Sequence, residues 1–149
     1  MDQALVDRMW RYLHAGLAMD LEALDALYDP EFENLRVDRS GLSVRLVKEQ
    51  FMHRFRALRA EGRVIGDSLA DVSFLATTVR ADHGSIVMRR EEDGVPTLYD
   101  FTWRREGGRW TTLLRELTVE QDLRPLIAVI EAGAVGAGAA DGGKVISAG

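Results

Sequence analysis

The chain has 149 residues, of which 46% are hydrophobic and 29% charged, as is typical of one globular domain with a sizeable core. Its formal net charge is −5 and acidic residues are interleaved with its 19 lysines and arginines, which argues against a nucleic-acid-binding surface. It has no cysteine, which excludes disulfides, thiolate nucleophiles and thiolate metal sites.

The N-terminal and apolar segments lead us to expect a cytoplasmic protein with no membrane partner. Residues 1–8 lack the basic start and apolar core of a signal peptide. The longest apolar run, residues 126–140, contains Glu131 and three glycines. It is therefore too short and too interrupted to span a bilayer.

Helices are predicted mainly in the first half of the chain. Asp2 can cap a first helix that runs to about residue 18, because apolar residues recur there at three- and four-residue spacing. Asp20 can cap a short second helix, which ends at Pro30 because proline cannot continue a helix. A third apolar stripe predicts a helix that starts at Val47 and ends near Gly62.

Strands are predicted around and after the third helix. Alternating patterns indicate strands at residues 32–38 and 42–46, then a long bent strand at 64–80 and another at 85–91. Two aromatic and β-branched runs flank Glu106-Gly107-Gly108 and predict a long hairpin from residue 95 to about 120. Strands grouped after helices indicate an α+β fold, with helices covering one face of a curved sheet.

The composition changes after Asp122, which divides the chain into a domain of residues 1–122 and an extension of residues 123–149. Twelve of the last eighteen residues are glycine or alanine, a composition typical of a flexible tail. The apolar pair Val145-Ile146 is expected to dock on a sheet edge or at a pocket mouth. The glycines of residues 133–138 do not form a dinucleotide loop, because no βαβ unit surrounds them and the third glycine of that motif is missing.

Three segments in this order resemble the nuclear transport factor 2-like superfamily, in particular its bacterial SnoaL-like members. They are residues 24–34 (LDALYDPEFEN), 47–51 (VKEQF) and 99–110 (YDFTWRREGGRW). The resemblance implies a cone-shaped fold in which three helices of the N-terminal half pack on a curved, mostly antiparallel sheet and enclose an apolar pocket. The superfamily includes isomerases, cyclases and dehydratases as well as non-catalytic binding and assembly domains, so the fold does not decide the function.

Asp100 is the candidate catalytic residue. It lies between Tyr99 and Phe101 in a strand that should be largely buried. A buried carboxylate is either paired with a cation or unusually basic, and an unpaired one suits a general base. The alternatives are a structural ion pair with Arg115 or Arg89, and exposure on the other face of the sheet.

The pocket is expected to be mainly aromatic, with a few polar groups. Asn34 and Arg36 share a strand face with Phe32, because strand side chains alternate, and they can bind a carbonyl or carboxylate group. Arg36 can equally pair with Asp38 or Glu33, and the aromatic residues can simply form the core. The predicted ligand-binding residues are Tyr12, Tyr28, Phe32, Asn34, Arg36, Phe51, Phe55 and Arg115.

No cofactor or metal site is expected, because the three histidines are far apart and none has metal-ligand spacing. The leading hypothesis is a domain that binds a small apolar ligand. The first alternative is a cofactor-free isomerase, cyclase or dehydratase that uses a pocket carboxylate as general base. The second is a protein-interaction or assembly module. Large apolar groups on both faces of the long hairpin also predict a homodimer through the outer face of the sheet.

Overall fold

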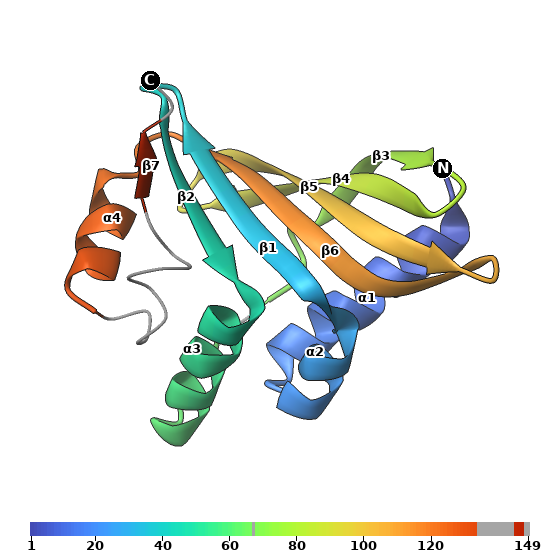
Figure 1. The fold of residues 1–149 in the computed structure, drawn as a ribbon, viewed down its shortest axis with the longest axis horizontal. Helices are drawn as coiled ribbons and strands as arrows, with labels where there is room; N and C mark the ends of the chain where they lie inside the picture. Colours follow the sequence, from blue (N-terminus) through green and yellow to red (C-terminus); the bar gives the residue numbers. More distant parts are fainter. Residues whose placement is uncertain (67, 134–144, 148–149) are drawn as a thin grey trace.

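A computed structural model describes residues 1–66, 68–133 and 145–147 (Figure 1). Within them the chain is α+β, as predicted, with two helices, a strand pair and a third helix before the remaining strands. The elements are α1 (Gln3–Leu17), α2 (Leu21–Leu27), β1 (Tyr28–Asp38), β2 (Leu42–Val47), α3 (Lys48–Ala60), β3 (Ser73–Val79), β4 (His83–Glu92), β5 (Val95–Glu106), β6 (Arg109–Glu120), α4 (Arg124–Glu131) and β7 (Val145–Ser147).

The first two helices begin at the predicted caps. Asp2 accepts a hydrogen bond from the backbone N–H of Leu5 at 2.8 Å, and Asp20 accepts one from Ala23 at 3.1 Å. Such bonds satisfy backbone donors that have no partner inside the helix. Figure 1 shows α1, α2 and α3 on one side of the sheet and α4 beside its β2 edge.

The described strands form one curved sheet in the order β3-β4-β5-β6-β1-β2-β7. β1 lies between β2 and β6 and pairs with β6 in parallel, whereas the other neighbouring strands are antiparallel. The turn between β5 and β6 consists of Gly107 and Gly108, whose φ angles of 55° and 74° lie in the left-handed region. This is the conformation that two-residue hairpin turns require and glycine adopts readily.

Residues 64–80 do not form the long strand that was predicted. Only Ser73–Val79 is a strand, and the described residues from Glu61 to Val72 lie in turns and irregular backbone. The apolar residues Ile65 and Leu69 of this loop face the cavity described below. An irregular segment that covers an apolar cavity can thus carry the same scattered apolar residues as a strand.

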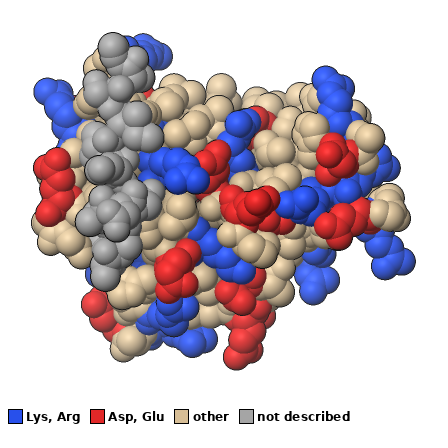
Figure 2. Space-filling view, viewed as in Figure 1, with Lys and Arg blue, Asp and Glu red and all other residues tan. Residues whose placement is uncertain are grey.

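The C-terminal elements extend the sheet. β7 pairs with β2 in antiparallel orientation through Leu42↔Ser147, Ser43↔Ile146 and Val44↔Val145, which is the sheet-edge docking expected for this segment. No described helix has the length and apolar character needed to cross a membrane. On the face shown in Figure 2, acidic and basic side chains are interspersed.

Candidate functional site

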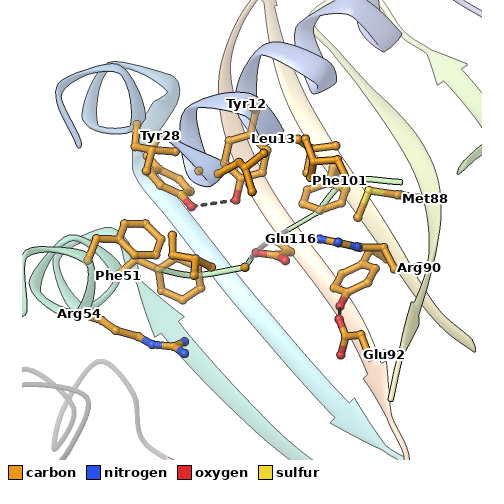
Figure 3. Close-up of a pocket in the computed structure, with 18 of the residues that line it drawn as sticks. Tyr12, Leu13, Tyr28, Phe51, Arg54, Met88, Arg90, Glu92, Phe101 and Glu116 are labelled. Carbon is orange, nitrogen blue, oxygen red and sulfur yellow. Dashed lines mark hydrogen bonds between the residues drawn. The ribbon is translucent and has the colours of Figure 1, made fainter. Parts of the chain in front are cut away.

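A cavity of about 460 Å³ lies between the inner face of the sheet and the helices (Figure 3). Residues of α1, α2, α3 and β1 contribute to its wall, together with β4, β5, β6, α4 and the loop after α3. The lining residues are Tyr12, Leu13, Gly16, Leu17, Leu24, Tyr28, Arg36, Phe51, Arg54, Phe55, Ile65, Gly66, Ser68, Leu69, Met88, Arg90, Glu92, Tyr99, Phe101, Glu116 and Leu126.

An aromatic wall closes the side of the cavity next to α3. Phe51 and Phe55 are one helical turn apart, so both side chains lie on the same face of that helix. Their ring centroids are 5.8 Å apart, and the Tyr28 ring lies 5.9 Å from Phe51. Edge-to-face contacts at such distances hold the rings in fixed orientations.

Tyr12 and Tyr28 place a polar group in this aromatic surrounding. Their hydroxyl groups are hydrogen-bonded at 2.8 Å, and Figure 3 shows this pair at the upper side of the site. Burial raises the pKa of both phenols far above their usual value, so both remain neutral at physiological pH. The pair therefore acts through hydrogen bonds rather than charge.

Glu116 is the buried carboxylic acid of the cavity. It projects from β6 and is only 8% exposed, and Figure 3 shows its carboxyl group between Phe51 and Arg90. Burial raises the pKa of Glu116 because a low-dielectric environment disfavours its charged form, while Arg36 and Asn34 oppose this effect only in part. A carboxyl group of this kind can donate a hydrogen bond when protonated or act as a base when ionised.

Three arginines carry positive charge to the cavity. Arg36 donates from Nε to Asn34 and from Nη1 to Glu120, both at 2.9 Å. Arg90 is held by the Asp71 carboxylate and the backbone oxygen of Ser68. The third, Arg54, projects from α3 between Phe51 and Phe55 in sequence.

Seven of the nine predicted site residues lie in or directly behind the cavity. Phe32 and Asn34 are almost completely buried behind the wall, where Phe32 packs against Tyr28 and Asn34 accepts the bond from Arg36. The five that line the cavity are Tyr12, Tyr28, Arg36, Phe51 and Phe55.

Asp100 and Arg115 lie elsewhere, contrary to the expectation that they belong to the cavity. Tyr99 and Phe101 face inward, so Asp100 between them points to the outer face of the sheet. There it lines a surface depression together with Arg115, and the two are ion-paired at 3.7 Å. This is the structural pairing that was the alternative for Asp100.

Glu116, Arg54 and Arg90 were not singled out from the sequence. Residue Asn34 is paired with Glu116 across the parallel β1–β6 ladder, so both side chains lie on the inner face. That pairing, which brings distant segments together, has no signal in the local sequence. Among the described residues, no group of three or more histidine, aspartate or glutamate side chains could hold a metal ion.

Neither a protein-family model nor a curated protein sequence matches the chain. Solved structures do match. An NTF2-like protein of unknown function from Shewanella baltica OS155 has a TM-score of 0.58 and 13% identity, over 78% of this chain and 90% of that one. A second such protein, from Silicibacter pomeroyi DSS-3, has a TM-score of 0.57 and 13% identity, over 78% of this chain and 92% of that one.

A third NTF2-like protein of unknown function, from Shewanella oneidensis MR-1, has a TM-score of 0.55 and 13% identity, over 79% of this chain and 98% of that one. This chain has the nuclear transport factor 2-like fold. The NTF2-like likeness confirms the cone-shaped architecture predicted from the order of the elements. Because all three identities are low, the likeness is one of fold, and the function has to be argued from the cavity itself.

Proposed function

We propose that this NTF2-like protein binds a small molecule with an apolar body and one polar end. The observation that supports this function is the mixed lining of the cavity. Phe51 and Phe55 offer an apolar wall, while the hydroxyl pair of Tyr12 and Tyr28 and the carboxyl group of Glu116 converge from other sides. A few polar groups in an apolar concavity are the usual form of a small-ligand site. We further propose that the protein belongs to the SnoaL-like branch and is located in the cytoplasm.

Filling the cavity tests this function. Gly16 lines the cavity from α1, and a Cβ built on it meets no atom within 4 Å, so a larger side chain enters open space without displacing the helix. We expect wild type to bind 2-acetylnaphthalene, a neutral carbonyl compound with an apolar body, and Gly16→Phe to bind it about tenfold more weakly by isothermal titration calorimetry. Ala57→Phe, which adds the same ring at an exposed position of α3, is the matched control.

A panel of small ketones and carboxylic acids with aromatic and aliphatic bodies extends this test. If no member binds wild type, or if Gly16→Phe binds every ligand as well as Ala57→Phe does, the cavity is not a binding site and the proposal is wrong.

A second candidate function is proton transfer next to a carbonyl group, in a cofactor-free isomerase, cyclase or dehydratase. The observation in its favour is Glu116, a buried carboxyl group whose pKa is raised by its burial. A base with a raised pKa removes protons more effectively than an ordinary carboxylate, and neighbouring hydroxyl donors can stabilise the enolate that forms. Tyr12 and Tyr28 are such donors.

Isotope exchange separates catalysis from binding. In D₂O, wild type should accelerate deuterium incorporation into the methyl group of 2-acetylnaphthalene, as followed by proton NMR, and Glu116→Gln should not. If both proteins bind the ketone and neither exceeds the rate in buffer, the binding function stands and the catalytic candidate is rejected.

A further inference from the structure

The arginines that line the cavity differ in whether their guanidinium groups are hydrogen-bonded or ion-paired with other residues. Arg36 is fixed by Asn34 and Glu120, and Arg90 by Asp71 and Ser68. Arg54 makes no hydrogen bond or ion pair with any residue in the described part of the chain. Its neighbour on the solvent side of the same helix, Arg56, does pair, with Glu49 at 3.0 Å. Arg54, although partly exposed to solvent, is therefore the one cavity arginine among the described residues whose guanidinium has no partner.

The surroundings of Arg54 leave its positive charge uncompensated. Burial and the positive charges of Arg36 and Arg63 lower the pKa of Arg54, and Glu116 offsets these effects only in part. A cationic ligand would meet three arginines here, whereas an anionic group would offset the repulsion of Arg54 by Arg36 and Arg63.

The position of Arg54 on α3 fixes where such an anionic group would lie. Arg54 follows Phe51 by three residues and directly precedes Phe55, and Figure 3 shows its guanidinium extending from α3 on the side of Phe51 away from the Tyr12–Tyr28 pair. An apolar body that packs against the two phenylalanine rings has its end within reach of this guanidinium. A planar guanidinium can form two parallel hydrogen bonds with a carboxylate.

We infer that the ligand is a carboxylic acid with an apolar body, and that Arg54 binds its carboxylate. This inference rests on the proposed binding function and adds the chemical class of the ligand. It also assigns different parts of the ligand to different residues of the cavity. The phenylalanine rings hold the apolar body and Arg54 holds the acid group at its polar end.

A pair of ligands that differ only in charge tests the inference. We expect wild type to bind 2-naphthoate at least about tenfold more tightly than 2-naphthamide at pH 7.5, as measured by isothermal titration calorimetry. Arg54→Gln should bind 2-naphthoate about tenfold more weakly than wild type does and should leave the affinity for 2-naphthamide unchanged. Arg56→Gln, on the solvent side of the same helix, should behave like wild type with both ligands.

The outcomes separate this inference from the proposed function. If wild type binds acid and amide equally, or if Arg54→Gln retains full preference for the acid, the cavity binds small molecules but Arg54 does not select an acid. If neither of these ligands nor 2-acetylnaphthalene binds, the binding function fails and the inference fails with it. Unchanged thermal unfolding of Arg54→Gln and retained binding of 2-naphthamide show that a loss of acid binding does not come from unfolding.

Discussion

The hydroxyl oxygens of Tyr12 and Tyr28 lie 2.8 Å apart, and neither hydroxyl makes another hydrogen bond within the described residues. One phenol must therefore donate a hydrogen bond to the other, and the proton of the acceptor phenol makes no hydrogen bond of its own. That proton is available to a carbonyl oxygen in the cavity. The pair thus stabilises the fold and leaves a donor for a ligand.

Removing either hydroxyl should destabilise the protein more than its loss from a surface would. We expect Tyr12→Phe to lower the free energy of unfolding by about 1–2 kcal/mol, because the buried hydroxyl of Tyr28 loses its partner. The Tyr12→Phe/Tyr28→Phe double variant should lose clearly less than the sum of the two single variants, since no unpaired hydroxyl remains. Urea denaturation of the four proteins measures this coupling, and strictly additive losses would contradict it.

Glu116 predicts a dependence of stability on pH. Its folded-state pKa is raised, so the stability gained from the protonated form is complete below its ordinary value of 4.5 and is lost as pH rises through the folded-state pKa. Glu116→Gln keeps a neutral side chain at every pH. It should therefore melt at a higher temperature than wild type at pH 8, with the difference shrinking towards pH 4.5. Glu22→Gln at an exposed position is the control, and an equal effect of both variants would refute the prediction.

For Asp29 we expect stability to depend on pH in the opposite direction from Glu116, because stability is lost as pH falls. Burial opposes its ionisation, but hydrogen bonds from Arg104 at 2.8 Å, Thr112 at 2.6 Å and the Glu31 backbone at 2.9 Å outweigh it and lower its pKa to about 2. The ionised form is favoured above the ordinary value of 3.8, and this stability is lost as pH falls through about 2. We expect it to amount to roughly 2 kcal/mol at pH 7.

Two variants test this contribution of Asp29. Asp29→Asn and Arg104→Gln should both unfold at lower urea concentration than wild type at pH 7, and the deficit should narrow at pH 3. If either deficit is the same at both pH values, the carboxylate does not carry the effect.

The predicted homodimer, formed through the outer face of the sheet, remains a proposal that can be tested. Leu98 on β5 and Val119 on β6 are 49% and 51% exposed, and both point away from the cavity. Exposed apolar residues on neighbouring strands favour association with a second copy. Wild type should be dimeric by size-exclusion chromatography with light scattering, and Leu98→Lys/Val119→Lys monomeric. A wild-type monomer at micromolar concentration would refute the proposal.

Deleting residues 132–149 should expose the β2 edge. The deletion removes β7, which pairs with Leu42, Ser43 and Val44, while α4 ends before it at Glu131. Loss of this pairing should lower the melting temperature by about 2–4 °C, the shift that about 1 kcal/mol produces in a chain of this length. An unchanged melting temperature would mean that the pairing contributes nothing.

The sequence predicts those features that depend on neighbouring residues. Asp2 and Asp20 mark helix starts, and Gly107 and Gly108 mark a turn whose φ angles few other residues adopt. These signals are local, so they do not require knowledge of which strands are neighbours. The alternating aromatic residues of β5 show only that Asp100 lies on the opposite face from Tyr99 and Phe101. From the sequence, Asp100 is expected in the cavity, whereas the structure places it on the outer face beside Arg115.

The inward position of Glu116, in contrast, cannot be predicted from neighbouring residues. The β5–β6 ladder changes register near Trp103, and the buried residues Trp110, Leu113 and Glu116 are spaced by three rather than two. Simple alternation cannot place Glu116 on the inner face across such an irregularity. The unpaired state of Arg54 depends likewise on the packing of segments that are distant in the sequence.

The parallel pairing of β1 with β6 determines when the cavity can be completed during folding. Arg36 and Glu120, which meet across this ladder, are 84 residues apart in the chain. Contacts between such distant segments require a large loop to close before any stabilisation is gained, which slows folding. A nascent chain that ends before β6 contains the sequences of α1, α2 and α3 but not Glu116, which is paired with Asn34 in the complete sheet. Glu116 therefore joins the cavity only when β6 pairs with β1.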